Sequence, residues 1–147
     1  MKTIIATIKP VHLADIRSGK KKFEIRKSCP AESPFRVLCC ESGSGGKILA
    51  EFVSEAPILK DPRRYPELVA CSCVSMEMAE EYAAGKEVWF WDVTNMIDYC
   101  STKGYRVRHI SEFGLKRAPQ SWCYVKEGTY ILLEGNKACP FCQDNKK

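Results

Sequence analysis

The segment at residues 19–27 (GKKKFEIRK) constrains the fold of this chain more than any other feature. It holds five cations and one carboxylate around two apolar residues, and it directly follows a short helix-like segment, residues 10–18. Because alternate side chains of a strand point to opposite faces, a strand here would place Lys22, Glu24 and Arg26 together. The two apolar residues would then point into a core. The pattern predicts a strand whose polar face suits a polar, anionic ligand.

The basic residues are unevenly distributed along the 147-residue chain, whose formal net charge is +5. Residues 1–30 carry eight Lys or Arg and two acidic residues, whereas residues 31–147 carry 15 Lys or Arg and 16 acidic residues. The basic excess therefore lies in the part of the chain that contains the predicted strand. This asymmetry favours a polyanionic or phosphate-bearing partner, and a solvated basic face is the alternative interpretation.

The alternation of apolar and polar residues predicts a small α+β barrel of about six strands with two or three short helices. Its length and its hydrophobic fraction of 45% suit one domain, at residues 1–135, followed by a polar tail, at 136–147. The strand patterns cover residues 3–8, the basic segment, 36–41, 47–57, 86–93, 106–110 and 129–133, and the helical patterns cover 10–18, 63–71 and 75–85.

The chain has no pattern typical of export or membrane insertion. Its first ten residues are too short and too interrupted for a signal peptide, and no apolar run approaches the roughly 18 residues of a membrane helix. Nine cysteines without an export signal argue against a disulfide scaffold. We therefore expect a cytoplasmic monomer that does not bind membranes.

Two motifs lie far apart in the sequence. Gly19, Lys21, Glu24 and Arg26 follow the pattern G-x-K-x-x-E-x-R, and residues 118–122 read APQSW. Together they resemble the ASCH domain family, whose fold is similar to that of the PUA domain; the second motif looks like the P-P-Q-S-aromatic segment of its short, stand-alone members. The resemblance extends over most of the predicted domain, and it indicates the fold of the chain more than the reaction it could catalyse.

The resemblance implies a small, partly open PUA-like β-barrel with a cleft beside the first helix and the basic strand. Family members are thought to bind RNA or nucleotides in that cleft. The residues support such a ligand, because the cations can neutralise phosphate, Glu24 can accept from a base amino group, and an aromatic ring can stack on a base. An internal ion pair between Glu24 and Arg26, with the lysines facing water, is the alternative. The predicted ligand-binding residues are Lys9, Lys20, Lys21, Glu24, Arg26, Gln120, Ser121 and Trp122.

Whether the chain is an enzyme stays open at this point. One branch of the family resembles an amidohydrolase for acetylated cytidine that uses a lysine, a threonine nucleophile and a glutamate. Lys21 falls on the lysine position, but Glu24 stands at the threonine position. Because a carboxylate nucleophile would form an anhydride, catalysis would instead need Glu24 as a general base on water and Lys21 beside the developing oxyanion. His12, in the predicted first helix, could act as a general acid, or it could be an ordinary helix histidine.

Three hypotheses follow. The first is a protein that binds RNA or a nucleotide and could act as a regulator. The second is a hydrolase of acylated nucleosides or RNA, with Lys21 and Glu24 as catalytic residues. The third is a protein-interaction module that uses Trp89 and Trp91, for which core packing is the simpler use.

The cysteines raise a separate question. Cys139 and Cys142 have the C-x-x-C spacing of a zinc knuckle, and a tetrahedral structural zinc would need another two thiolates. Cys71 and Cys73 are the best candidates for these. A redox pair or a disordered tail would fit the same spacing, and the basic motif itself requires no cofactor.

Overall fold

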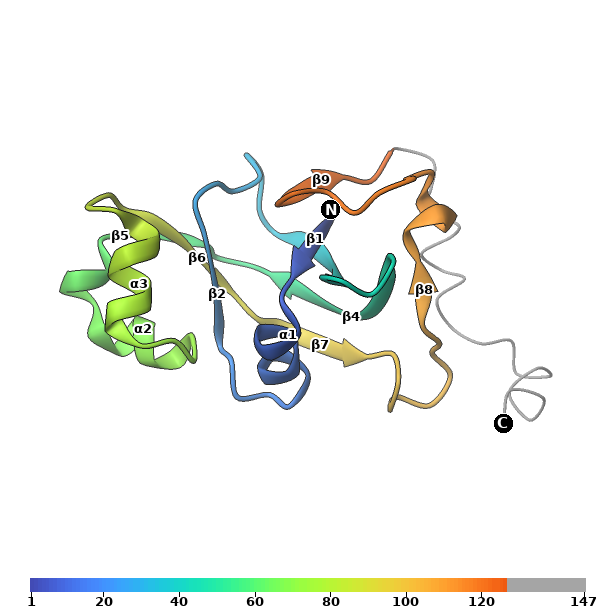
Figure 1. Ribbon diagram of the computed structural model, residues 1–147, viewed down its shortest axis with the longest axis horizontal. Helices are drawn as coiled ribbons and strands as arrows, with labels where there is room; N and C mark the ends of the chain where they lie inside the picture. The colour runs from blue at the N-terminus through green and yellow to red at the C-terminus, as the bar shows by residue number, and fades with distance from the viewer. Residues whose placement is uncertain (127–147) are drawn as a thin grey trace.

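The computed structural model describes residues 1–126 as a mixed α+β structure (Figure 1). The larger sheet has the order β7-β4-β3-β1-β9, with β8 paired to β4, and the smaller sheet has the order β2-β6-β5. The strands are β1 (Lys2–Ile8), β2 (Phe23–Arg26), β3 (Phe35–Glu41), β4 (Lys47–Ser54), β5 (Ile58–Lys60), β6 (Val88–Asp92), β7 (Thr94–Asp98), β8 (Arg108–His109) and β9 (Trp122–Tyr124). The helices are α1 (Pro10–Arg17), α2 (Pro66–Cys71) and α3 (Met76–Ala83), with 3-10 turns η1 (Pro62–Arg64) and η2 (Ile110–Phe113).

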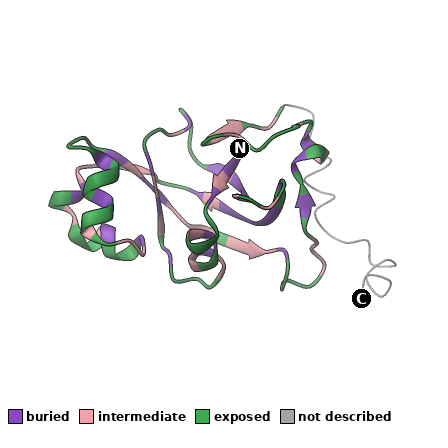
Figure 2. Ribbon diagram, viewed as in Figure 1, coloured by how far each residue is buried: buried purple, intermediate pink, exposed green. Residues whose placement is uncertain are grey.

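Strand β1 lies inside the larger sheet, parallel to β3 and antiparallel to β9. Both of its faces are covered, which explains its nearly continuous apolar sequence. Ile4 and Ile8 pack in one core cluster with Leu13 of α1, whereas Ile5 packs on the other face in a second cluster with Tyr99. Most residues of β1, β3 and β4 are buried, whereas those of β9 are half-buried or exposed (Figure 2).

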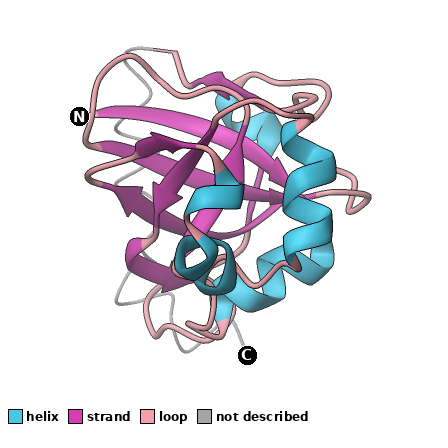
Figure 3. Ribbon diagram, turned by 90° about the vertical axis from the view of Figure 1, so that its left-hand side faces the viewer, coloured by secondary structure: helices cyan, strands magenta, loops and turns pink. Residues whose placement is uncertain are grey.

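The smaller sheet supports the helical end of the molecule, from which Figure 3 is viewed. Val69 of α2 and Ala79 of α3 are buried with Phe90 of β6, and Phe23 and Ile25 of β2 pack against them. This is the apolar face that the alternation in the basic segment predicts. Two residues beyond β6 the chain enters β7 of the larger sheet, so one stretch of chain connects the two sheets.

The helices are short and have clear ends. Pro10 begins α1, and the Ser75 side chain accepts from the Met78 amide at 3.1 Å, so it caps α3 as its sequence predicts. Within residues 1–126, no helix has both the length and the apolar character needed to cross a bilayer.

The α+β class is confirmed, but the strand arrangement differs from the expected barrel of about six strands. In the described part of the chain, nine strands form two sheets, and their pairings close no barrel. The predicted strand at 129–133, the domain boundary at 135, the tail at 136–147 and its two cysteines lie outside the described residues.

Candidate functional site

Lys21 is positioned by the turn between α1 and β2. Gly19 has a φ of +81°, a left-handed conformation that glycine adopts readily, and the Lys21 amide donates to the Asp15 carbonyl at 3.0 Å. The Lys21 side chain is thereby buried, and its Nζ donates to the backbone carbonyl of Ser72. Lys22, which strand alternation placed on the charged face, is exposed instead. That prediction was wrong because β2 begins only at Phe23, so residues 21 and 22 follow the turn.

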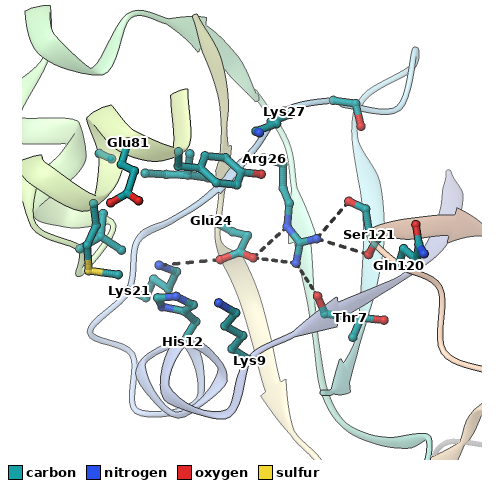
Figure 4. Close-up of a pocket in the computed structure, with 16 residues that line it drawn as sticks. Thr7, Lys9, His12, Lys21, Glu24, Arg26, Lys27, Glu81, Gln120 and Ser121 are labelled. Carbon is teal, nitrogen blue, oxygen red and sulfur yellow. Dashed lines mark hydrogen bonds and ion pairs between the residues drawn. The ribbon is translucent and has the colours of Figure 1, made fainter. Parts of the chain in front are cut away.

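Glu24 lies between two cations. Its Oε1 is 3.7 Å from Lys21 Nζ, and its Oε2 is 2.9 Å from Arg26 Nη2 and accepts from Arg26 Nε at 3.0 Å. The exposed fractions of Lys21, Glu24 and Arg26 are 2%, 4% and 8%. Such burial of charge is tolerated only when the charges are paired and hydrogen-bonded, as Figure 4 shows for these three.

The Arg26 guanidinium is fully engaged by protein oxygens. Besides Glu24, it donates through Nη2 to the Thr7 carbonyl at 2.8 Å, and through Nη1 to the Ser121 carbonyl and hydroxyl at 3.3 and 3.2 Å. Five contacts thus match its five N–H groups. Because a phosphate would have to displace one of them, the geometry favours Arg26 as a positioning residue.

Thr7 attaches the second motif to β1. Its hydroxyl donates to the Pro119 carbonyl at 2.6 Å, and its amide donates to the Ser121 carbonyl at 3.0 Å. The pairing of β1 with β9 continues this contact. As a result, Gln120 and Ser121 lie beside the charged residues of β2, although about 95 positions separate the two motifs in the sequence.

A pocket of about 790 Å³ lies between this network and α3. Its volume falls within the roughly 300–1,000 Å³ typical of small-molecule sites. Predicted ligand-binding residues that line it are Lys9, Lys21, Glu24, Arg26, Gln120 and Ser121.

The other two predicted ligand residues do not line this pocket. Lys20 is exposed in the turn after α1. Trp122 is half-buried, and the centroid of its ring lies 6.4 Å from that of Trp91 and 5.3 Å from that of Tyr124. Its Nε1 donates to the Ser28 hydroxyl at 3.0 Å. The indole of Trp122 thus has packing partners of its own.

The pocket also contains residues that were not among the predicted ligand-binding residues. Met78 and Tyr82 of α3 form part of its apolar lining, and Lys27 places its Nζ 4.9 Å from the centroid of the Tyr82 ring. His12 of α1, which the sequence suggests only as a candidate general acid, lines it as well. The sequence could have indicated Met78 and Tyr82 by their i, i+4 spacing, which places both on one face of an otherwise acidic helix.

Burial shapes the protonation of two pocket residues. It lowers the pKa of Lys21, against the opposing effect of the Glu24 charge. It also lowers the pKa of His12, and the nearby Lys21 lowers it further. Both groups therefore lose a proton more readily than they would in water, which is a common property of residues in functional sites.

The predicted zinc site is only partly within the described residues. Cys71 is exposed and Cys73 is half-buried. Residues 1–126 contain no group of three or more His, Cys, Asp or Glu side chains that could hold a metal ion. Cys139 and Cys142 lie outside the described residues, so the four-cysteine site stays a prediction.

Similarity to known proteins is visible at the level of the fold. No protein-family model matches the sequence, and neither does any curated protein. The crystal structure of ASCH from Zymomonas mobilis superposes with a TM-score of 0.78 at 15% identity, covering 93% of this chain and 96% of that chain. A mutant of the same protein gives the same TM-score and identity, with coverage of 94% and 100%. The chain therefore has the fold of an ASCH domain, as its two motifs predict.

Proposed function

We propose that this ASCH-fold protein binds RNA or a nucleotide in the pocket between β2 and α3. One observation carries the proposal: two motifs far apart in the sequence contribute to a single pocket lined by paired, buried charges. The fold alone would not select this function, because one fold hosts many activities.

The lining of the pocket has the chemistry that a nucleotide needs. Lys9 and Lys27 are exposed cations at the pocket and can neutralise phosphate, in addition to the buried Lys21. Gln120 offers an amide that can pair with a base edge. Tyr82 offers an aromatic ring on which a base can stack.

Glu24 is suited to accept a hydrogen bond from a ligand. Both N–H contacts from Arg26 go to Oε2, whereas the Lys21 ammonium lies 3.7 Å from Oε1, longer than a hydrogen bond. Oε1 therefore retains capacity to accept from a base amino group. A purely structural ion-pair network is the alternative, but such a network needs no pocket beside it.

The proposal is tested by measuring affinity for cytidine 5′-monophosphate and for a short single-stranded RNA at several salt concentrations. We expect RNA affinity to fall as salt rises, because phosphate binding releases counterions. Lys9→Ala should weaken binding, and since Lys9 is exposed its loss should leave the fold intact. Lys20→Ala is the matched control, because Lys20 is an exposed lysine just beyond the other end of α1 and does not line the pocket. Salt-insensitive binding, or equal affinity in the two variants, would contradict the proposed site.

A hydrolase is the second candidate, favoured by the buried Lys21 with its lowered pKa beside Glu24. In that reaction Glu24 would take a proton from water as the water attacks the acyl carbon, and Lys21 would stabilise the oxyanion. Breaking the C–N bond of acetylated cytidine would release cytidine and acetate. Lys21→Ala should abolish this turnover in folded protein, whereas pure wild-type protein that leaves acetylated cytidine and RNA unchanged would exclude the activity.

A further inference from the structure

His12 is the pocket residue whose chemistry is least explained by the network described above. It projects from α1 and lies beside Lys21 and Lys9 in the pocket (Figure 4). Its two ring nitrogens have different surroundings. Nδ1 is sealed from solvent without a hydrogen-bond partner among the described residues, whereas Nε2 is not sealed in this way.

This asymmetry selects one neutral form of the ring. A neutral imidazole carries a single N–H, on either Nδ1 or Nε2. A proton on Nδ1 would create a buried donor without an acceptor, a situation that folded proteins rarely tolerate. The proton is therefore better placed on Nε2, where it can donate into the pocket.

The surrounding charges oppose formation of the cation. Lys21 and Lys9 disfavour a positive charge on the ring, whereas Glu24 and Asp15 favour it. Burial has the largest effect and lowers the pKa of His12. A protonated ring would also place an N–H on the sealed Nδ1. We therefore expect His12 to be neutral at pH 7, with its N–H on Nε2.

Lys21 has an unused donor next to this ring. Its ammonium carries three N–H groups, of which one donates to the Ser72 carbonyl and one can face Glu24. Among residues 1–126 the third has no partner, so it remains for a ligand. Two donors, one cationic and one neutral, therefore border the same part of the pocket, an arrangement that suits an oxygen atom carrying negative charge.

We propose that His12 is a ligand-binding residue that, through Nε2–H and together with Lys21, holds an acceptor oxygen of the bound nucleotide. This role rests on the proposed function and specifies which ligand atoms the pocket recognises. The oxygen can belong to the nucleoside or to a phosphate, and the ligands below distinguish the two.

The state of the ring can be measured without any ligand. Nitrogen-15 NMR of the wild-type protein at pH 7 should show His12 neutral and protonated on Nε2. The chain has only two histidines, so the spectrum of His12→Phe assigns the signals. An Nδ1–H tautomer, or a cationic ring at pH 7, would overturn the proposal.

The ligand role is tested by the affinities of cytidine and cytidine 5′-monophosphate for wild type, His12→Phe and His12→Gln. Loss of one neutral donor in His12→Phe should weaken binding about threefold to tenfold, and His12→Gln should keep most of the affinity because its amide also donates. An equal loss for both ligands assigns the oxygen to the nucleoside, and a loss for the monophosphate alone assigns it to the phosphate. Val11→Ala is the control, because Val11 lies in the same helix and is 63% exposed.

The two proposals fail in different ways. If the wild-type protein binds neither cytidine 5′-monophosphate nor RNA, the proposed function is wrong. If wild type binds and folded His12→Phe binds equally well, the role of His12 alone is wrong.

Discussion

Arg26 and Ser121 are 95 positions apart in the sequence, yet Arg26 Nη1 donates to both the carbonyl and the hydroxyl of Ser121, at 3.3 and 3.2 Å. The same guanidinium is paired with Glu24 and donates to the Thr7 carbonyl. One side chain thereby holds two walls of the pocket together and fixes the carboxylate that lies between them. Arg26 therefore acts by holding the pocket together and not by contacting a ligand directly.

Arg26→Ala should reduce the free energy of unfolding by about 3–5 kcal/mol, the cost typical of removing one partner from a buried ion pair. Glu24 would keep only the more distant Lys21, and the carbonyls of Thr7 and Ser121 would lose a donor. Urea denaturation measures this change. Arg63→Ala is a suitable control, because its ion pair with Asp61 is at the surface and should change stability little. Equal effects of the two substitutions would contradict the role given to Arg26.

Tyr82→Ala should weaken nucleotide binding by roughly 1–3 kcal/mol, the range observed when an aromatic ring that stacks on a base is removed. Tyr82→Phe should retain the affinity, because the ring and not the hydroxyl does the stacking. Calorimetric titration with cytidine 5′-monophosphate compares them. Tyr124→Ala serves as the control, since Tyr124 is exposed but does not line the pocket. If Tyr82→Ala binds as tightly as this control, α3 is not a wall of the ligand site.

A second charged cluster predicts how stability depends on acid. Partial burial of Glu112 acts to raise its pKa, but hydrogen bonds from Arg108 and Arg106, at 2.7 and 3.1 Å, outweigh it and lower the pKa to about 2. A carboxyl whose pKa is lowered by folding stabilises the protein fully above its unfolded pKa, near 4.5. That contribution is lost as pH falls from about 5 through the folded pKa near 2.

Glu112→Gln should therefore be less stable than wild type at pH 6, and the difference should shrink toward pH 2. Thermal unfolding of both proteins across this range measures the difference. A difference that stays constant with pH would show that the charge of Glu112 contributes nothing to stability.

Metal analysis of the full chain tests the cysteine prediction. If Cys139 and Cys142 bind zinc with Cys71 and Cys73, purified protein should contain one zinc per chain, and the double substitution Cys139→Ser and Cys142→Ser should remove it. Wild-type protein prepared with zinc and found free of it would contradict the prediction.

The sequence predicted most of the strands and both pocket motifs because these depend on local patterns. The alternation in the basic segment correctly separated Glu24 and Arg26 from Phe23 and Ile25. It failed at Lys22, because residues 20–22 have no regular structure and the strand begins only at Phe23, so the alternation does not extend to Lys22.

Other features depend on tertiary contacts. Strand β7 has little alternation and exists because it pairs with β4, and the three-residue β9 exists because it pairs with β1. The position of Tyr82 follows from the packing of α3 on the smaller sheet. The saturation of Arg26 by oxygens from two distant segments could likewise not be read from local sequence.

The most direct test of the central proposal is a crystal structure of the protein with cytidine 5′-monophosphate at saturating concentration. We predict that the nucleotide occupies the pocket between β2 and α3, with an oxygen within hydrogen-bond distance of Lys21 Nζ. A nucleotide bound elsewhere, with this pocket empty, would contradict it.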